Sequence, residues 1–330
     1  MKLTFEQIIS ATNGIIRTEQ NDLGLELFRF SRDQEGFFYK THPVFCKESF
    51  FNGYFGRNCR TGAGITLDFI TDAKEILINF QKVECLVADR PWVQVFDLYI
   101  DNEYIQSYNL TNEIFYKTSG DQHRYTIYFP CYSFPIISSV ELKDATVFLP
   151  RKKPVDILFL GDSITHGACS LHPSNTYVAR VSRSLDIAVL NQGNSGFVYD
   201  AGSIEKVCEP KIVITAYGIN DSTRKNVQMI ERDTTDFMKK LKSVYKDSKI
   251  VSILPLWTVW NSENENFKKD ERACLKRIYE EYSDYIIDGF NLVPHNKKYF
   301  FDDVHPNDKG FKLYAENLVK ELISILEEKK

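Results

Sequence analysis

The sequence predicts an α/β protein in which an antiparallel β-sandwich precedes a doubly wound parallel sheet. Before about residue 150, short alternating or aromatic runs are separated by turn residues, as in antiparallel strands. After residue 154, apolar runs alternate with amphipathic segments, as in a parallel sheet with right-handed crossovers. We therefore expect a β-sandwich domain over residues 1–150 and an α/β domain over residues 151–330, with a linker at 151–154.

The first half contains four clear strand patterns. A short amphipathic helix is expected before them, near residues 5–11, and Asp101-Asn102 is expected to form the turn after the third strand. The expected strands are 64–69, 75–80, 93–100 and 124–129.

The second half alternates between the two periodicities. Its short apolar runs are expected to be buried parallel strands, and its longer amphipathic segments are expected to be the crossover helices. The expected strands are 155–160, 186–191, 211–217, 249–255 and 284–288, and the expected helices are 176–185, 224–246, 265–282 and 307–328.

Composition excludes several classes of protein. The chain has 330 residues and a net charge of −4, and its lysines and arginines are spread among acids, so nucleic-acid binding is not expected. No segment is apolar enough to span a membrane, and the amino terminus lacks the apolar core of a signal peptide. The 7 cysteines include no CxxC pair, which argues against a disulfide framework or a zinc cluster. A cytoplasmic protein is expected.

Ser163 is the first candidate for chemistry. It lies in Gly161-Asp162-Ser163-Ile164, directly after the apolar run 155–160. A glycine that ends a buried parallel strand places the following hydroxyl in the crevice at the carboxyl edge of the sheet, where such folds bind ligands.

His305 is the candidate base for this serine. Serine is a weak nucleophile until a neighbouring base takes its proton, and imidazole suits that task near neutral pH. Asp302 precedes His305 by three residues, so one helical turn would let its carboxylate brace the ring. The alternative is a solvated loop before the last helix, with Asn307 as its N-cap.

Acyl transfer also needs donors for a developing oxyanion. The candidates are the backbone N–H of Ser163, the backbone N–H of Gly193 and the side-chain amide of Asn220, each just after a predicted strand. The alternatives are an ordinary turn for Gly193 and an Asx turn or a cap for Asn220.

These motifs together resemble the signature blocks of the SGNH (GDSL-type) hydrolase superfamily. The blocks match in order at 161–164, at Gly193, at Gly218-Ile219-Asn220-Asp221 and at 302–305, with isoleucine at position 164 where leucine is usual. The resemblance implies a flavodoxin-like doubly wound sheet over about residues 155–330. It also implies nucleophile Ser163, base His305, acid Asp302, and an oxyanion hole from Ser163, Gly193 and Asn220.

The first half resembles the jelly-roll-like domain that precedes the catalytic domain in some bacterial carbohydrate esterases. Val95-Phe96-Asp97-Leu98-Tyr99 is similar to the Asp-Leu-Tyr signature of one such domain. The resemblance implies that this domain packs beside the active-site face.

Four further residues were weighed against these candidates. His166 is too close to Ser163 along the chain to act as its base, and is expected on the surface or a wall; Ser195 is the rival nucleophile. Trp257 and Trp260 follow the fourth strand and could line a substrate pocket, although packing in the core is the expected fate of at least one.

The expected function is a serine esterase that acts on small acyl esters, above all O-acetyl groups on carbohydrate, without metal or cofactor. Two alternatives stay open: an acyltransferase using the same triad, and a non-catalytic carbohydrate-binding protein. The absence of a Gly-x-Ser-x-Gly elbow argues against the ordinary α/β-hydrolase fold.

Overall fold

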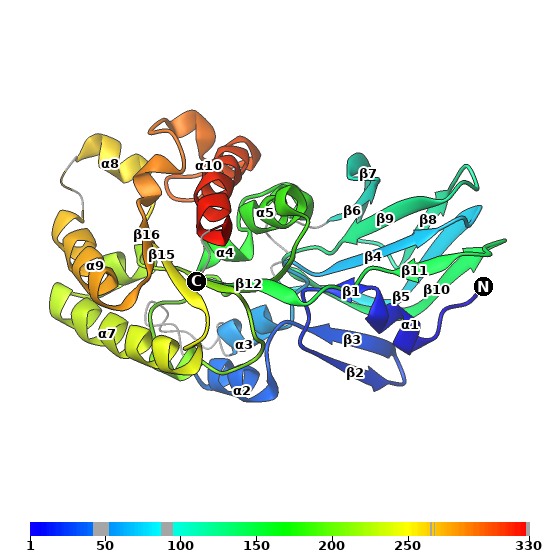
Figure 1. The fold of residues 1–330 in the computed structure, drawn as a ribbon, viewed down its shortest axis with the longest axis horizontal. Helices are drawn as coiled ribbons and strands as arrows, with labels where there is room; N and C mark the ends of the chain where they lie inside the picture. Colours follow the sequence, from blue (N-terminus) through cyan, green and yellow to red (C-terminus); the bar gives the residue numbers. More distant parts are fainter. Residues whose placement is uncertain (42–52, 87–94, 265, 267, 328–330) are drawn as a thin grey trace.

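The computed structural model describes residues 1–41, 53–86, 95–264, 266 and 268–327 (Figure 1). Residues 93–94 of one expected strand, and 265, 267 and 328 of two expected helices, lie outside these residues. Within the described part, no helix is both long enough and apolar enough to cross a membrane.

The second half forms a parallel sheet of five strands. Its strands are β12 (Val155–Gly161), β13 (Ala188–Gly193), β14 (Ile212–Ala216), β15 (Lys249–Ile253) and β16 (Tyr285–Ile287). They are arranged in the order β13-β12-β14-β15-β16, which is the flavodoxin-like order 2-1-3-4-5. The order reverses at β12, so the crevice between β12 and β14 is the ligand-binding position of such a sheet.

Helices cover both faces of this sheet (Figure 1). One core packs α5 (Tyr177–Leu185) and α10 (Asp308–Glu327) on one face, and a second core packs α7 (Val227–Val244) and α9 (Lys269–Tyr282) on the other. The predicted doubly wound fold is confirmed. The predicted helix 224–246 corresponds to α7, which begins at Val227 because Asn226 caps it through its side chain; Arg224 is the last residue of a separate short helix, α6 (Ile219–Arg224).

The first half contains two antiparallel sheets that enclose a separate apolar core. One sheet has the order β1-β4-β9-β6-β7, with β11 (Phe148–Pro150) beside β4; the other has the order β2-β3-β10-β5-β8. The predicted sandwich is therefore confirmed. The strands are β1 (Thr12–Asn13), β2 (Arg17–Asn21), β3 (Gly24–Phe28), β4 (Thr66–Thr71), β5 (Glu75–Cys85), β6 (Val95–Ile100), β7 (Glu103–Asn109), β8 (Glu113–Lys117), β9 (His123–Tyr128) and β10 (Ser133–Lys143).

Local sequence explains two features of this sandwich. Helix α1 (Phe5–Ser10) begins at a capping box formed by Thr4 and Gln7. Asp101 and Asn102 have φ of 49° and 71°, and this left-handed pair forms the two-residue turn expected between β6 and β7.

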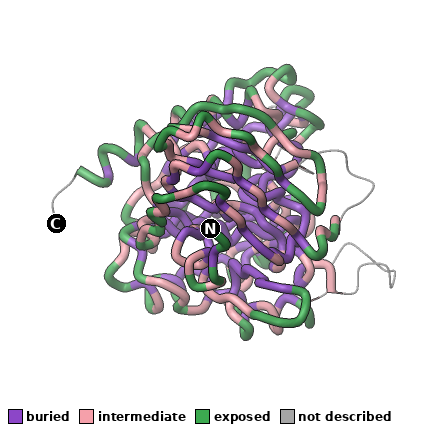
Figure 2. Tube along the Cα trace, turned by 90° about the vertical axis from the view of Figure 1, so that its right-hand side faces the viewer, coloured by how far each residue is buried: buried purple, intermediate pink, exposed green. Residues whose placement is uncertain are grey.

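Two helices of the first half pack against the parallel sheet, which the sequence did not predict. Helices α2 (Arg32–Lys40) and α3 (Tyr54–Cys59) place Phe38 and Phe55 in the same apolar core as residues of β12, β13 and α7. Figure 1 shows both helices below β12, between α7 and the strands β2 and β3. In Figure 2 the buried residues run through the interior, and the exposed residues lie outside.

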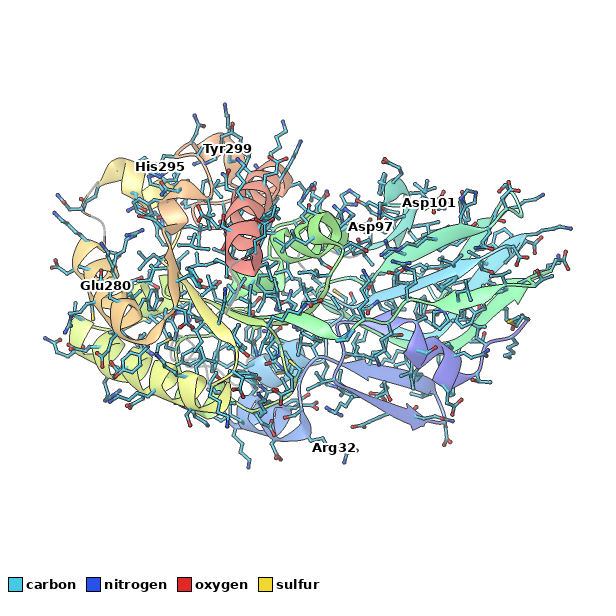
Figure 3. All side chains as sticks on the ribbon, viewed as in Figure 1. Arg32, Asp97, Asp101, Glu280, His295 and Tyr299 are labelled. Atoms are coloured by element: carbon cyan, nitrogen blue, oxygen red, sulfur yellow. The ribbon has the colours of Figure 1, made fainter. Side chains whose placement is uncertain are left out.

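Asp97, on β6, joins the sandwich to the segment of the second half that contains His172 and Ser174. Its buried carboxylate accepts hydrogen bonds from Ser174 N, Ser174 Oγ and Ser107 Oγ at 3.1, 2.6 and 2.6 Å, and lies 3.0 Å from His172 Nδ1. Burial opposes ionisation, but these hydrogen bonds outweigh it and lower the pKa of Asp97. Figure 3 labels Asp97 where the sandwich meets the second half. The aspartate of the Asp-Leu-Tyr run is thus a structural link between the halves.

Candidate active site

Ser163 lies at the first position of a short helix that follows β12. β12 ends at Gly161, and Asp162 caps α4 (Ser163–His166) by accepting a hydrogen bond from Ile164 N at 3.0 Å. Asp162 is 3 % exposed, whereas Ser163 is partly exposed at the crevice. The turn therefore buries the carboxylate and presents the hydroxyl.

Ser163, His305 and Asp302 form one hydrogen-bonded chain. Ser163 Oγ lies 2.8 Å from His305 Nε2, and His305 Nδ1 lies 2.8 Å from Asp302 Oδ2. An ionised carboxylate can only accept, so Nδ1 carries the ring proton and the lone pair of Nε2 faces the serine hydroxyl. A serine, a base and an orienting acid are thus in the order that nucleophilic catalysis requires.

The loop around Asp302 keeps its carboxylate ionised. Burial favours the neutral acid, but hydrogen bonds from the His305 ring and from the backbone N–H groups of His305 and Val304 hold the pKa of Asp302 well below its usual range. The neighbouring Asn307 caps α10 by accepting from Gly310 N at 3.1 Å. The cap expected under the alternative interpretation thus exists beside the hydrogen-bonded chain.

Asn220 lies in the first turn of α6, after β14. Its amide donates to Phe197 O at 3.0 Å. A primary amide carries two N–H groups, so the second can be donated to a ligand. Ser163 N is the first N–H of α4 and has no acceptor within its own helix.

Gly193 does not fit the role predicted for it. Its N–H donates to Asn191 Oδ1 at 2.8 Å, so it is not available for an oxyanion. β13 continues through Gly193, and a Cβ atom there would lie 2.3 Å from His166 N. The residue is glycine because the backbone of α4 packs directly against the strand.

Gly196, and not Gly193, is the glycine in the turn that follows β13. It has φ of 79° and is partly exposed, and its carbonyl accepts from Arg224 Nη1 at 2.6 Å. The adjacent Phe197 accepts the Asn220 amide, so Gly196 lies beside Asn220. The signal that could have identified it is Ser195-Gly196 itself, a small-residue turn beyond the strand.

His166 and Ser195 are both buried, contrary to the predicted surface or wall position of His166. His166 Nδ1 lies 3.1 Å from Ser195 Oγ, and His166 Nε2 lies 2.8 Å from Cys131 O. Burial holds the pKa of His166 well below its usual value. Tyr132 stacks on this ring, and its hydroxyl lies 2.5 Å from Ser195 Oγ. Ser195 is therefore enclosed in a neutral network and is not presented as a nucleophile.

The two tryptophans have different environments. Trp257 is 7 % exposed in the core and contacts Phe300 and His295. Of these two, Figure 3 labels His295. Trp260 is partly exposed and lines a small hollow with Ile219 and Pro255. Its helix α8 (Val259–Glu263) contacts the loop that carries Asp302 and His305, because Val259 N donates to Asp303 O at 2.9 Å.

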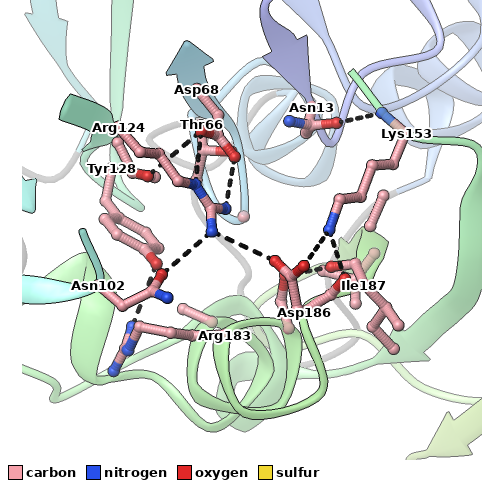
Figure 4. Close-up of a pocket in the computed structure, with 16 residues that line it drawn as sticks. Asn13, Thr66, Asp68, Asn102, Arg124, Tyr128, Lys153, Arg183, Asp186 and Ile187 are labelled. Atoms are coloured by element: carbon pink, nitrogen blue, oxygen red, sulfur yellow. Dashed lines mark hydrogen bonds and ion pairs between the residues drawn. The ribbon is translucent and has the colours of Figure 1, made fainter. Parts of the chain in front are cut away.

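Two other groups of side chains could suggest binding sites. Cys169, Asp302 and His305 offer ligand atoms within 4.8 Å of one another, but His305 and Asp302 already bond each other. A second hollow lies between the halves of the chain (Figure 4). Arg124 bonds Asp68 at 2.6 Å and Asp186 at 3.3 Å there, so ion pairs occupy it. Its lining residues, all within the described chain, do not include Ser163 or His305.

Comparison with known proteins identifies the second half. Residues 159–313 match the GDSL-like Lipase/Acylhydrolase family. Comparison with curated proteins gives no significant match.

The fold is similar to three solved structures, all under 25 % identical, which therefore inform the fold alone. A salicylyl-acyltransferase, SsfX3, from a tetracycline biosynthetic pathway aligns with a TM-score of 0.77 and 13 % identity, covering 96 % of this chain and 94 % of the other. A family two carbohydrate esterase from Cellvibrio japonicus aligns with a TM-score of 0.64 and 16 % identity, covering 96 % of each chain. A second family two carbohydrate esterase, from Corynascus thermopiles, aligns with a TM-score of 0.65 and 16 % identity, covering 81 % of this chain and 95 % of the other.

Proposed function

Because residues 159–313 match the GDSL-like Lipase/Acylhydrolase family, we propose that the chain is a serine esterase acting on small acyl esters. The observation that supports this most is the 2.8 Å contact between Ser163 Oγ and His305 Nε2, with Asp302 on the far side of the ring. We further propose that residues 1–150 and 151–330 are two domains, of which the second carries the triad.

The proposed reaction proceeds through an acyl-enzyme. Ser163 Oγ attacks the ester carbonyl carbon while its proton passes to His305 Nε2, and Asp302 stabilises the resulting imidazolium. The alcohol leaves with that proton. Water then attacks the acyl carbon and gives a proton to His305, which passes it to Ser163 Oγ as the bond between that oxygen and the acyl group breaks and the carboxylic acid is released.

The proposed oxyanion hole differs from the predicted one. The donors would be the backbone N–H of Ser163, the second amide N–H of Asn220 and the backbone N–H of Gly196 in place of Gly193. Gly196 is favoured because it lies beside Asn220 at the crevice, whereas the N–H of Gly193 is committed to Asn191.

The proposed substrates are O-acetyl groups on carbohydrate. Support comes from the fold shared with family two carbohydrate esterases and from the partly exposed Trp260 near the loop that carries Asp302 and His305, since an indole face suits the apolar face of a sugar. Turnover of an aryl acetate and release of acetate from an acetylated xylo-oligosaccharide test this proposal. A wild-type protein that hydrolyses neither would refute it, and EDTA should leave the rate unchanged.

The acyltransferase remains the second candidate, because the salicylyl-acyltransferase shares the fold over nearly the whole chain. The acyl-enzyme would then be attacked by an acceptor alcohol in place of water. Product analysis with and without added acceptor alcohols separates the two reactions. Acyl transfer that exceeds hydrolysis in the presence of acceptor would favour the transferase.

Activity should fall as the solution is acidified, because an imidazolium at His305 cannot accept the serine proton. Asp302 should stay ionised in mildly acidic solution, since its pKa is held well below its usual value. Burial raises the pKa of Asp162 to about 6, so Asp162 also changes its charge when the solution is acidified. The measurement is kcat/KM between about pH 4 and pH 9.

The control for this pH profile is Asp162→Asn, which keeps an oxygen for the Ile164 N–H and removes the ionisation. We expect the fall in kcat/KM on the acidic side of the profile to persist in this variant. Its disappearance would assign the fall to Asp162 and not to His305.

Catalytic efficiency should fall as the acyl chain grows from acetyl to octanoyl, because the bulky indole of Trp260, which lines a small hollow, would exclude a long chain from the proposed pocket. Trp260→Ala should reduce this preference by roughly tenfold, since removing an indole opens space for several methylene groups. Trp257→Ala is the control and should lower thermal stability, because Trp257 packs in the core. Octanoyl esters that outperform acetyl esters in the wild type would contradict the proposal.

A further inference from the structure

Arg29 is a completely buried arginine that joins the first half of the chain to the end of β13, which leads into the turn at Gly196. It follows β3 and is 0 % exposed. On one side it donates from Nε to Thr61 O at 2.9 Å and from Nη2 to Asn58 O at 2.9 Å. On the other side Nη1 donates to Asn191 O, and it lies 3.4 Å from Gly193 O.

The charge of Arg29 has no carboxylate partner among the described residues. The acceptors around it are backbone carbonyls and the hydroxyl of Thr61, at 3.0 Å from Nη2. Burial lowers the pKa of Arg29 to about 10. An unpaired buried charge opposes folding unless hydrogen bonds compensate it, so apolar packing alone does not explain an arginine at this position.

The strand end that Arg29 holds packs directly against the nucleophile helix. The carbonyls of Asn191 and Gly193 are its acceptors, and Gly193 is so close to α4 that a Cβ atom would lie 2.6 Å from Thr165 C. The Asn191 side chain also donates to Thr165 O at 2.9 Å. A shift of this strand end would therefore move the helix that begins at Ser163.

The turn beyond the strand is held from the first half as well. Asn58 Nδ2 donates to Asn194 Oδ1 at 3.2 Å, and Tyr132 OH lies 2.5 Å from Ser195 Oγ. Thr61 lies between the two sets of contacts, because its Oγ1 accepts from Arg29 and is 2.8 Å from His166 Nε2. Residues 191–196 are thus supported by side chains that the SGNH motifs do not contain.

We propose that Arg29 is a positioning residue for the esterase reaction, fixing residues 191–196 and α4 so that the oxyanion donors face the carbonyl oxygen attacked by Ser163. The inference rests on the proposed function. It makes the first half of the chain part of the catalytic apparatus and not only an accessory domain. A positive charge behind the donors also favours the developing negative charge in a buried environment.

The test compares Arg29→Gln and Arg29→Lys with wild type on an aryl acetate, with rates normalised to active sites counted by complete phosphonate labelling. We expect kcat to fall at least tenfold in both variants while KM stays within about twofold, because positioning acts on the transition state. Arg17→Gln is the matched control. Arg17 pairs with Glu19 and Glu35 in the first half, so its loss should lower stability and leave normalised kcat unchanged.

Thr61→Val provides a milder perturbation in case the Arg29 variants fail to fold. It removes the hydroxyl that contacts Arg29 and His166 while keeping the side-chain volume. We expect a decrease in kcat of roughly threefold to tenfold at constant KM. Normalised kcat within twofold of wild type in every variant that folds would overturn the inference and leave Arg29 a structural residue. A wild-type protein without esterase activity would instead refute the proposed function.

Discussion

Ser163→Ala should lose at least about a thousandfold in kcat, because without the hydroxyl no acyl-enzyme forms and only oxyanion stabilisation and binding remain. The protein should fold normally. Ser163 is partly exposed, and the substitution removes one hydrogen bond, to His305 Nε2. The measurements are the rate of aryl acetate hydrolysis, active-site labelling with a serine-directed phosphonate, and thermal unfolding.

Ser195→Ala is the control for this experiment, because Ser195 is the rival serine and lies in the neighbouring turn. It should still be labelled by the phosphonate at Ser163, whereas Ser163→Ala should not be labelled. Loss of its hydrogen bonds to His166 and Tyr132 should lower its thermal stability. Phosphonate found on Ser195 in the wild type would refute the assignment of the nucleophile.

The fold could be predicted largely because each element of the second half carries a local signal. The strand periodicities located β12 to β16 to within two residues at every end, and the flavodoxin-like order followed from the resemblance. The signals that failed depend on tertiary contacts. Apart from α1, the half that contains helices α2 and α3 has strand patterns, and the apolar side chains of these two helices pack in the same core as residues of the parallel sheet.

The candidate site divides in the same way. Ser163, Asp302 and His305 lie at motif positions, and the structure brings them into one hydrogen-bonded chain. Gly193 is the first glycine after a predicted strand, but the strand extends through it and the turn glycine is Gly196. Arg29 belongs to no local motif, because the residues that accept its hydrogen bonds are distant from it in the sequence, the strand residue Asn191 among them. Only the folded chain brings that arginine to the strand end.

Asn220→Ala should lower kcat roughly a hundredfold or more and change KM little, because the amide donates mainly to charge that develops in the transition state. The structure adds a second consequence. Asn220 also donates to Phe197 O at 3.0 Å, so the alanine variant frees the turn that contains Gly196. Two oxyanion donors would then be affected by one substitution, which places the expected loss at the upper end of that range.

Thr223→Ala, on the same helix α6, is the matched control for Asn220. Thr223 is exposed, and its hydroxyl bonds only the backbone carbonyls of Ile219 and Asn220 among the described residues. We expect its kcat to stay within about twofold of wild type, since the helix position is kept and no oxyanion donor is lost. The measurement is steady-state hydrolysis of an aryl acetate by both variants. If Asn220→Ala raises KM and leaves kcat unchanged, Asn220 binds the ground-state substrate and the oxyanion donors lie elsewhere.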